Sequence, residues 1–257
     1  MAFNAKPKIL FSSILKDATL SATDTATGYD VDNIIDLRPY TLHKFNAFGT
    51  KYITADYGSA VEADALGLVG HNLGTAVATV SVEYSSDNFA ADTHEALAGF
   101  LPANDKAIMK EFASASARYW RIKIVTAAVA AQIGVALLGE VLTFERWPSS
   151  GFDPDSLSIV ASSSISKSGN MLGATLKYVL RTVSMTFRTI TPSWITNTFK
   201  PAWDSHFEEL KPFLLAWDIT NHATEVYFLR IPENFSLKMP FNPVRRNLTL
   251  TLTGVKE

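Results

Sequence analysis

Apolar and polar residues alternate along many short segments of this chain, and this alternation constrains the fold more than any other feature. It is clearest at 80–85, 120–124 and 248–253, where every second residue is apolar. Neighbouring side chains of a β-strand point to opposite faces, so the pattern predicts strands with one buried face. Glycine, proline and asparagine residues separate these runs at the short spacing typical of β-sandwiches. The sequence therefore predicts a mainly β protein.

The segment 147–155 is the clearest seam in the sequence. It reads Trp-Pro-Ser-Ser-Gly-Phe-Asp-Pro-Asp, and its two prolines, glycine and two serines are turn residues that end a strand. A chain of 257 residues is long enough for two domains of roughly 100 to 150 residues each. We therefore expect a first domain at 1–147, a connector at 148–155 and a smaller domain at 156–257.

A long hairpin is predicted at 157–189. The segment 159–166 is rich in β-formers and small polar residues, and a Lys-Ser-Gly-Asn turn follows it. In the second strand the apolar residues change face near Arg181, which predicts a bulge or a sharp bend there. One small sandwich cannot bury both faces of such a hairpin, so we expect it to pair with hairpins of neighbouring subunits. The candidate assembly residues are Ile159, Ser163, Ile165, Arg181, Val183, Met185 and Phe187.

One helix is predicted near 192–211, with Thr191 as its N-cap and Pro192 at its first position. Pro201 is expected to kink or divide this helix because proline lacks a backbone N–H. An apolar stripe at helical spacing is expected to pack on a sheet, and its members are Trp203, Phe207 and Leu210. Two further strands are predicted at 235–241 and 248–253.

The composition of the chain and the motifs that it lacks argue against several classes of function. The 23 Lys and Arg residues against 25 Asp and Glu residues give a net charge of −2, which argues against an extended basic surface for nucleic acid. The absence of cysteine excludes disulfides and thiolate metal sites. No G-x-S-x-G turn, glycine-rich phosphate loop or paired-histidine zinc motif is present. We expect no enzyme activity, no cofactor and no metal.

Membrane insertion is not expected either. The most apolar stretch, 127–142, is shorter than the ~20 residues that a spanning helix needs.

Two local patterns leave alternatives open. Asp56, Glu62 and Asp64 are either members of a hydrolytic carboxylate pair or solvated loop residues, and the usual exposure of carboxylates favours the second. His71 follows an apolar segment in a short loop, where it either contacts a ligand or satisfies buried loop backbone. The second role is the more frequent one for such a histidine.

The first domain resembles the discoidin-like, galactose-binding-like jelly rolls over residues 25–147. The segments that carry the resemblance, in order, are Asn-Ile-Ile-Asp-Leu-Arg-Pro-Tyr at 33–40, Tyr-Ile-Thr-Ala-Asp-Tyr-Gly at 52–58, Ala-Leu-Gly-Leu-Val-Gly-His-Asn at 65–72, Ala-Arg-Tyr-Trp-Arg-Ile-Lys at 117–123, and 133–145. Such domains bind glycans, lipids or proteins through variable loops, so the fold alone does not fix the ligand. Arg38, Tyr40 and His71 are the candidate contacts with a glycan or partner, because they follow strand ends and offer stacking and hydrogen bonds.

The second domain resembles the tail-tube and distal-tail domains of long-tailed bacteriophages. The matching segments are Ser-Met-Thr-Phe-Arg-Thr-Ile at 184–190, Phe-Leu-Leu-Ala-Trp-Asp at 213–218, Val-Tyr-Phe-Leu-Arg at 226–230, Glu-Asn-Phe-Ser at 233–236, and 248–257. The resemblance implies a smaller β-sandwich with one flanking helix that assembles into a ring, six-fold by preference, around a DNA channel. The whole chain is similar to structural proteins of the tail tip.

These resemblances together imply a non-enzymatic virion protein of the tail tip, distal tail or baseplate. Its partners would be copies of itself in the ring and other tail proteins, with DNA only as passing cargo, and it would be made and assembled in the bacterial cytoplasm. The first domain would then be peripheral. The alternative is a carbohydrate-binding module that recognises a host-surface glycan and works as a monomer.

Overall fold

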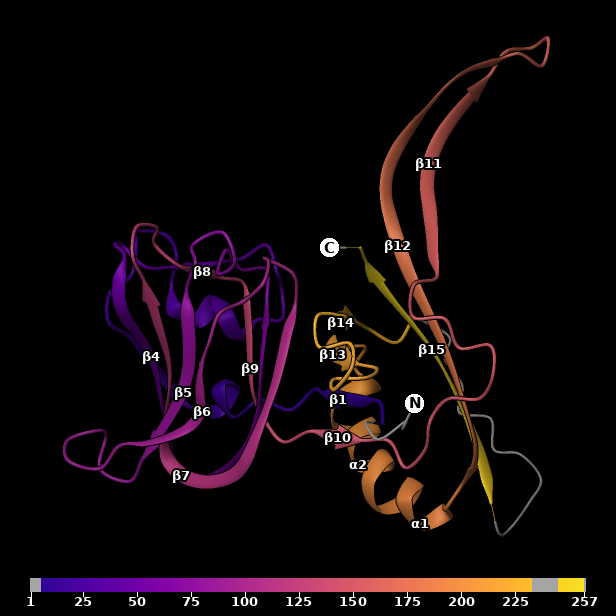
Figure 1. Cartoon of the computed structure of the whole chain (residues 1–257). Coiled ribbons are helices and arrows are strands. Elements are labelled where there is room, and N and C mark those ends of the chain that lie inside the picture. The colour runs from indigo at the N-terminus through magenta and orange to yellow at the C-terminus, as the bar shows by residue number, and fades with distance from the viewer. Residues whose placement is uncertain (1–5, 233–244, 257) are drawn as a thin grey trace. The chain divides into compact units, whose positions relative to one another are not determined.

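The computed structural model describes residues 6–232 and 245–256. The chain divides into two compact units. Unit 1 comprises Met1–Thr143 with Leu214–Val226, and unit 2 comprises Phe144–Phe213 with Tyr227–Glu257. Strands dominate both units (Figure 1). The prediction of a mainly β protein with two β parts and one helical segment is confirmed.

The elements of the first part of the chain are short strands around two long ones. They are β1 (Lys8–Leu10), β2 (Thr19–Ala22), β3 (His43–Lys44), β4 (Gly49–Val69), β5 (Thr79–Ser85), β6 (His94–Phe100), β7 (Ile108–Thr126), β8 (Gln132–Ile133), β9 (Val135–Gly139) and β10 (Leu142–Thr143), with 3₁₀ turns η1 (Ile14–Asp17) and η2 (Val31–Ile35).

The remaining elements follow Thr143. They are β11 (Leu157–Ile165), β12 (Met171–Ile190), a helical segment of α1 (Pro192–Trp194), η3 (Ile195–Phe199), α2 (Lys200–Ala202) and η4 (Trp203–Phe207), and strands β13 (Phe213–Ala216), β14 (Val226–Leu229) and β15 (Arg246–Val255).

Unit 1 is a sandwich built by the two long strands β4 and β7. They pair from Gly49↔Thr126 to Asp56↔Tyr119 and, after an irregularity, from Val61↔Ala117 to Leu68↔Ile108. The first stretch carries β2 on one side and β5 and β6 on the other, whereas the second stretch carries β9. The bend of β4 contains Gly58, whose φ of 84° suits glycine. One strand pair therefore supplies both layers.

Large apolar side chains fill the space between these layers. Trp120 is fully buried, lies 5.4 Å from the Tyr84 ring and donates its indole N–H to the Ala117 carbonyl at 3.0 Å. The core also takes in Phe45, Ile53, Leu66, Val80, Ile122 and Leu138. Strand β1 extends a separate sheet of order β10-β1-β13-β14.

Unit 2 has a three-stranded sheet of order β11-β12-β15, with the long strand β12 in the middle. β12 pairs with β15 from Leu180↔Val255 to Ile190↔Arg246, and with β11 from Leu157↔Arg181 to Ile165↔Met171. The inner half of β12 is buried on one face, where Phe187 stacks on Phe144 at 4.4 Å. The buried residues of this face are Val183, Met185, Phe187, Leu248, Leu250 and Leu252.

The bulges of β12 are not where the sequence predicted one. Arg181 pairs regularly with Leu157 and Gly254, and the register instead shifts beside Lys177, beside Leu172 and between Phe187 and Ile190. Arg181 also lies on the same face as Val183. The skipped residue Lys177 changes which side chains share a face, because Tyr178 pairs with Val160 whereas Leu176 pairs with the adjacent Ala161.

The helical segment begins as expected, with Thr191 at the N-cap and Pro192 in the first turn, and it ends at Phe207 rather than near 211. Glu145 accepts hydrogen bonds from the Thr191 N–H and hydroxyl at 2.8 and 3.0 Å. The segment turns π-helical on both sides of Pro201, which removes one N–H from the usual hydrogen-bond pattern.

The predicted boundaries differ from those of the two units. The first change of unit falls at Thr143/Phe144, and 214–226 returns to unit 1, which one linear boundary cannot reproduce. The predicted connector 148–155 lies inside unit 2 along β12, where Ser149 donates its N–H to the Thr186 carbonyl at 2.7 Å. The strand predicted at 235–241 falls outside the described residues.

Candidate functional site

One end of the unit 1 sandwich gathers most of its long loops. The pairs Gly49↔Thr126, Thr79↔Val125 and Val80↔Phe100 place four strand ends there, and Val69↔Val135 closes the other layer at the same end. We call the loops 23–48, 70–78, 101–107 and 127–134 the loop end. They are the loops that the fold brings together, because β4 and β7 each return to this end after their bend.

The exposed apolar side chains of unit 1 concentrate at the loop end. Across the described part of the unit, the large hydrophobic residues with exposed side chains are Tyr29, Tyr40, Phe48, Val77, Leu101, Val125 and Val129. Each lies in a loop of this end or at a strand terminus beside it. A gathering of exposed apolar groups on one face is typical of an interaction surface.

Tyr40 stands on a tightly braced loop. The Asp36 carboxylate accepts hydrogen bonds from the Arg38 N–H at 2.8 Å and the Thr41 hydroxyl at 2.6 Å. The Thr41 N–H donates to the Arg38 carbonyl at 3.1 Å. The loop thus holds Tyr40 with 77% of its surface exposed, while Arg38 beside it is also exposed.

Two glycines seat this loop on the sandwich. A Cβ on Gly70 or on Gly134 would lie 2.5 Å from the Pro39 carbonyl oxygen, closer than any real side chain allows. Gly70 also has a φ of 64°, which favours glycine. The backbone at 39 therefore rests directly on two loops of the same end, which positions the backbone next to Tyr40.

His71, the third candidate contact, is buried rather than exposed. Its Nδ1 accepts the Leu73 N–H at 3.3 Å, so it satisfies loop backbone, as in the second of the two roles considered for it. Burial lowers its pKa, although Asp105 acts in the opposite direction. A glycan or partner at the surface therefore meets Arg38 and Tyr40 without His71.

A second buried histidine, His43, escaped the sequence analysis. Its Nδ1 lies 3.0 Å from the Tyr29 carbonyl, and burial lowers its pKa against the opposing effects of that carbonyl and Asp24. The Nε2 atoms of both His43 and His71 are buried and without a hydrogen-bond partner among the described residues. Burial therefore favours the neutral form of both imidazoles, because a lowered pKa makes protonation harder.

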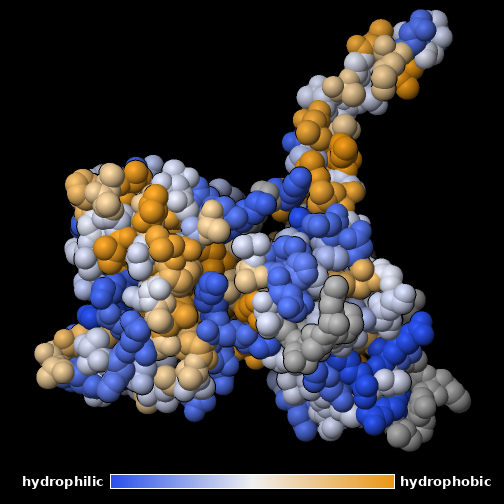
Figure 2. Space-filling view, in the orientation of Figure 1, coloured by the Kyte–Doolittle hydropathy of each residue, from blue (hydrophilic) through white to orange (hydrophobic). Residues whose placement is uncertain are grey.

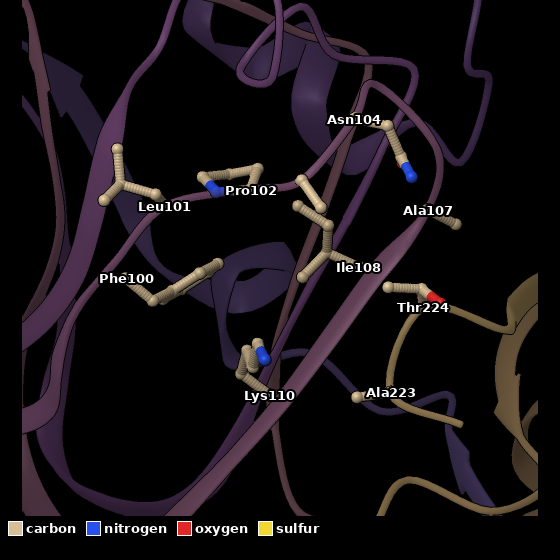
Figure 3. A pocket seen from close by; sticks show the side chains of 10 residues that line it. Phe100, Leu101, Pro102, Asn104, Ala107, Ile108, Lys110, Ala223 and Thr224 are labelled. Carbon is tan, nitrogen blue, oxygen red and sulfur yellow. The ribbon is translucent and has the colours of Figure 1, made fainter. Parts of the chain in front are cut away.

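A small cavity adjoins the loop end (Figure 3). It has a volume of about 90 Å³ and is lined by residues 100–104, Ala107, Ile108, Lys110, Ala223 and Thr224. Lys110 lies with its ammonium group 5.3 Å from the centre of the Phe100 ring. Pockets that enclose a small molecule have volumes of roughly 300 Å³ or more, so this cavity is too small to enclose one.

The carboxylates at 56, 62 and 64 do not form a hydrolytic pair. Asp56 is held by Arg118 in two hydrogen bonds of 2.7 and 2.8 Å, which lower its pKa. Asp64 accepts the Val141 N–H at 2.9 Å, and burial raises its pKa. The two lie on opposite sides of the β4 bend, and Glu62 is exposed. Within the described residues no group of three potential metal ligands occurs.

The candidate assembly residues separate into two sets. We call residues 157–180 the arm, and there Ile159, Ser163 and Ile165 are exposed. The other four are Arg181, Val183, Met185 and Phe187, which are buried within unit 2 itself and cannot serve as contacts with a neighbour. Their burial corrects the expectation that this face of β12 needs a second subunit.

Arg181 anchors the inner end of the arm. Its Nη1 donates to the Pro154 carbonyl at 2.5 Å and to the Asp155 carboxylate at 2.8 Å. Its guanidinium also lies 3.8 Å from the centre of the Tyr227 ring. The role of Arg181 is therefore to fasten the arm to unit 2.

Comparisons with known proteins extend the description of the fold only. Neither the protein-family models nor the curated proteins contain a match to this chain. A chitosan-binding module from a chitosanase/glucanase of Paenibacillus sp. IK-5 is 13% identical, with a TM-score of 0.40, and the match covers 49% of this chain and 97% of that one.

Two further solved structures are similar over half of the chain. The CBM32 of AlyQ, in complex with 4,5-unsaturated mannuronic acid, is 23% identical over 50% of this chain and 95% of its own, with a TM-score of 0.40. CpGH89CBM32-5 from Clostridium perfringens, in complex with GalNAc-β-1,3-galactose, is 13% identical over 50% and 99%, with a TM-score of 0.43. These likenesses carry no argument about a ligand of this chain, and none of the three is a phage tail protein.

No helix of the described residues is long and apolar enough to cross a membrane.

Proposed function

We propose that this chain is a non-enzymatic binding protein that recognises a carbohydrate at the loop end of unit 1. The observation that carries the proposal is the placement of Tyr40, exposed to 77% on a loop braced by Asp36 and seated on Gly70 and Gly134. A rigid, exposed aromatic ring loses little conformational freedom on binding, which favours affinity.

The chemistry of this surface suits a sugar. The flat ring of Tyr40 offers an apolar face for the C–H side of a pyranose, and its hydroxyl remains available for a hydrogen bond. The Arg38 guanidinium beside it provides several N–H donors for hydroxyl or carboxylate oxygens. An open surface of this kind fits the exposed part of a long glycan better than a small free sugar.

The test is a glycan array that includes host-surface polysaccharide, read with the natural chain and two variants. We expect Tyr40→Ala to weaken binding at least tenfold. Tyr178→Ala removes an exposed tyrosine from the arm and should leave binding unchanged. Absence of binding by the natural chain, or equal binding by Tyr40→Ala, would overturn the proposal.

The second candidate function is that of a structural subunit of a bacteriophage tail, in the tail tip, distal tail or baseplate. It is favoured by the arm, which exposes apolar side chains on a protruding hairpin, as an assembly element does. The setting in the virion, the six-fold ring and the passage of DNA are what the sequence resemblance implies. A reconstruction of an assembled tail would test them, and a peripheral position for unit 2 would count against the ring.

A further inference from the structure

The loop end contains two histidines that are buried rather than exposed. His43 has none of its surface exposed, and His71 has 5% exposed. The Nε2 atom of each ring makes no hydrogen bond of normal geometry within residues 6–232 and 245–256. Figure 2 shows apolar atoms among polar ones over the upper end of unit 1, where these loops lie. Buried polar atoms are nearly always hydrogen-bonded, so two exceptions at one end of the sandwich call for an explanation.

Both histidines adjoin the glycines that seat the braced loop with the exposed tyrosine. His71 follows Gly70 in the chain. His43 pairs with Ile133, the residue before Gly134. The Gly134 N–H donates to the Gly70 carbonyl at 3.0 Å, which joins the two seats to each other. A change at either ring therefore reaches the seat of the braced loop through one neighbouring residue or one strand pair.

Protonation of His71 breaks a hydrogen bond inside the loop end. The neutral ring accepts the Leu73 N–H at Nδ1, at 3.3 Å, so its own proton is on Nε2. An imidazolium carries a proton on both nitrogens and accepts no hydrogen bond. The charged ring therefore leaves the Leu73 N–H without its acceptor and turns two N–H groups toward each other.

Protonation of His43 has a different cost. Its Nδ1 lies 3.0 Å from the Tyr29 carbonyl and must donate to it, so the bare nitrogen of the neutral ring is Nε2. A second proton places a charged N–H group at a buried atom that has no acceptor among the described residues. Water supplies an acceptor to either ring once the surrounding loops open.

Burial lowers the pKa of both imidazoles and outweighs the charges around them. The charged groups around His43 are Asp24, Asp30, Lys44 and Lys51. Those of the loops packed around His71 are Asp36, Arg38, Asp105 and Lys106. Asp24 and Asp105 favour the protonated rings. However, Asp24 is paired with Lys51, and Asp105 accepts two hydrogen bonds from Thr75.

We propose that His43 and His71 form an acid-sensitive latch, so that acidification opens the loop end locally and weakens binding there while the sandwich stays folded. The opening is local because β3 and β8 pair over only two residues, whereas β4 and β7 pair along most of their length. The inference rests on the proposed function and names the regulation of the same site. A ligand that binds the closed loops is released as the open form becomes populated.

Proton linkage sets the size of the effect. A histidine that regains the ordinary pKa of 6.5 only in the open state makes opening up to about tenfold more favourable between pH 7.5 and pH 5.5. Two such histidines together give up to about a hundredfold change.

Amide hydrogen exchange measures the opening without any ligand. Each rate is divided by that of an unstructured peptide at the same pH, because intrinsic exchange itself depends on pH. The N–H groups of Phe45, Leu73 and Gly134 are bonded within the loop end. We expect their protection to fall by up to about a hundredfold from pH 7.5 to pH 5.5. They should exchange faster than the core amides of β7 at both pH values, as a local opening requires.

Three variants assign the effect to the two rings. His71→Asn keeps an acceptor near the position of Nδ1, and His43→Asn keeps a donor for the Tyr29 carbonyl, but neither new side chain takes up a proton. Each variant should reduce the pH effect to about tenfold, and the double variant should abolish it. The matched control is His94→Asn, which changes a histidine of unit 1 with 57% of its side chain exposed and should keep the full effect.

Three results would overturn the latch: protection that is equal at both pH values, loop-end amides that exchange no faster than the core of β7, or a pH effect that persists in the double variant. The first two are measured on the natural chain, so they decide the question even if a variant does not fold.

Glycan binding is measured separately at the same two pH values. The natural chain should bind more weakly at pH 5.5, and the double variant should bind equally at both. Equal affinity of the natural chain at both pH values would overturn the part of the proposal that concerns binding. If no glycan binds at either pH, the proposed function fails, whereas hydrogen exchange still decides whether the latch exists.

Discussion

The long strands β4 and β12 are of nearly equal length, 21 and 20 residues, yet the structure uses them in opposite ways. β4 bends near Gly58 and returns over its own first half together with β7, so that both of its halves face one core. β12 does not fold back, so its inner half reaches a core while its outer half extends as the arm.

This difference shows that alternation along a strand reports which face is apolar but not what covers that face. In β4 the covering layer is supplied by the chain itself after a bend. In the outer half of β12 the same kind of residue remains in water, and bulges beside Leu172 and Lys177 alter the register without folding the strand back. The following predictions test how far this contrast extends.

The largest effect is expected from one substitution made in both strands. Leu66→Ala removes a fully buried leucine of β4 and should lower the free energy of unfolding by about 2–5 kcal/mol. Leu176→Ala removes a leucine of the arm that is 58% exposed and should change it by less than about 0.5 kcal/mol. Urea unfolding monitored by circular dichroism measures both, and similar losses would contradict the contrast.

The next effect concerns the support of the loop end. Gly70→Ala, at a φ of 64°, places a methyl group against the Pro39 carbonyl oxygen and should cost about 1–3 kcal/mol by overpacking in addition to the strain of its backbone. Because Pro39 precedes Tyr40, glycan binding should weaken as well. Gly169→Ala, in the turn of the arm, also adds a Cβ at positive φ but meets no neighbouring atom within 4 Å, so it isolates the cost of the backbone conformation. Equal losses of unfolding free energy from the two variants would mean that the backbone at Pro39 shifts without measurable cost.

Local chemistry was sufficient to predict many of these elements. The alternation at 80–85, 120–124 and 248–253 coincides with β5, β7 and β15, and Pro192 lies in the first turn of the helical segment, where proline is favoured. Such signals depend on residues next to one another in the sequence, so no knowledge of distant partners is required.

Distant pairing left no such signal. Ile9 in β1 pairs with Leu142 and Leu215, and nothing around residue 9 indicates those partners. The same limit explains why the sequence did not show that His71 is buried, because its burial depends on how loops from several strands pack together. The exposure of Arg38 and Tyr40 could be predicted from the sequence, because loops at the strand ends of a sandwich are generally exposed.

A pH effect is expected in unit 1 from its buried histidines. Burial lowers the pKa values of His43 and His71 below the ordinary 6.5, so the unfolded chain binds more protons than the folded unit as the pH falls below that value. Stability should therefore decrease from pH 6.5 downward until the lowered pKa values are passed, by up to about 1.4 kcal/mol for each unit of lowering.

Urea unfolding at pH 7.5 and pH 5.5 measures this loss. The double variant His43→Gln with His71→Gln should be less stable at pH 7.5 but should lose less between the two pH values. Carboxylates such as Asp64 are present in both chains and cancel in the comparison. The arm contains no histidine or carboxylate, so its accessibility to trypsin at Lys167 should not follow the same pH dependence. If the double variant loses as much unfolding free energy between pH 7.5 and pH 5.5 as the natural chain, the two histidines are not the cause of the pH effect.

The smallest effect on stability should come from making the arm polar. Ile165 and Met171 are paired across the end of the hairpin, and both side chains are mostly exposed. Replacing both by threonine keeps residues that suit a strand while removing apolar surface, so each replacement should change the free energy of unfolding by no more than about 0.5 kcal/mol.

The value of this variant lies in what a larger loss would mean. A decrease above about 1.5 kcal/mol in dilute protein would indicate that the arm packs on its own chain in solution, because only a buried apolar side chain loses that much when it is made polar. The outer half of β12 would then resemble β4, with a covering layer supplied by the same molecule. A negligible loss in dilute protein, together with weaker self-association at high concentration, would place the missing cover on another copy.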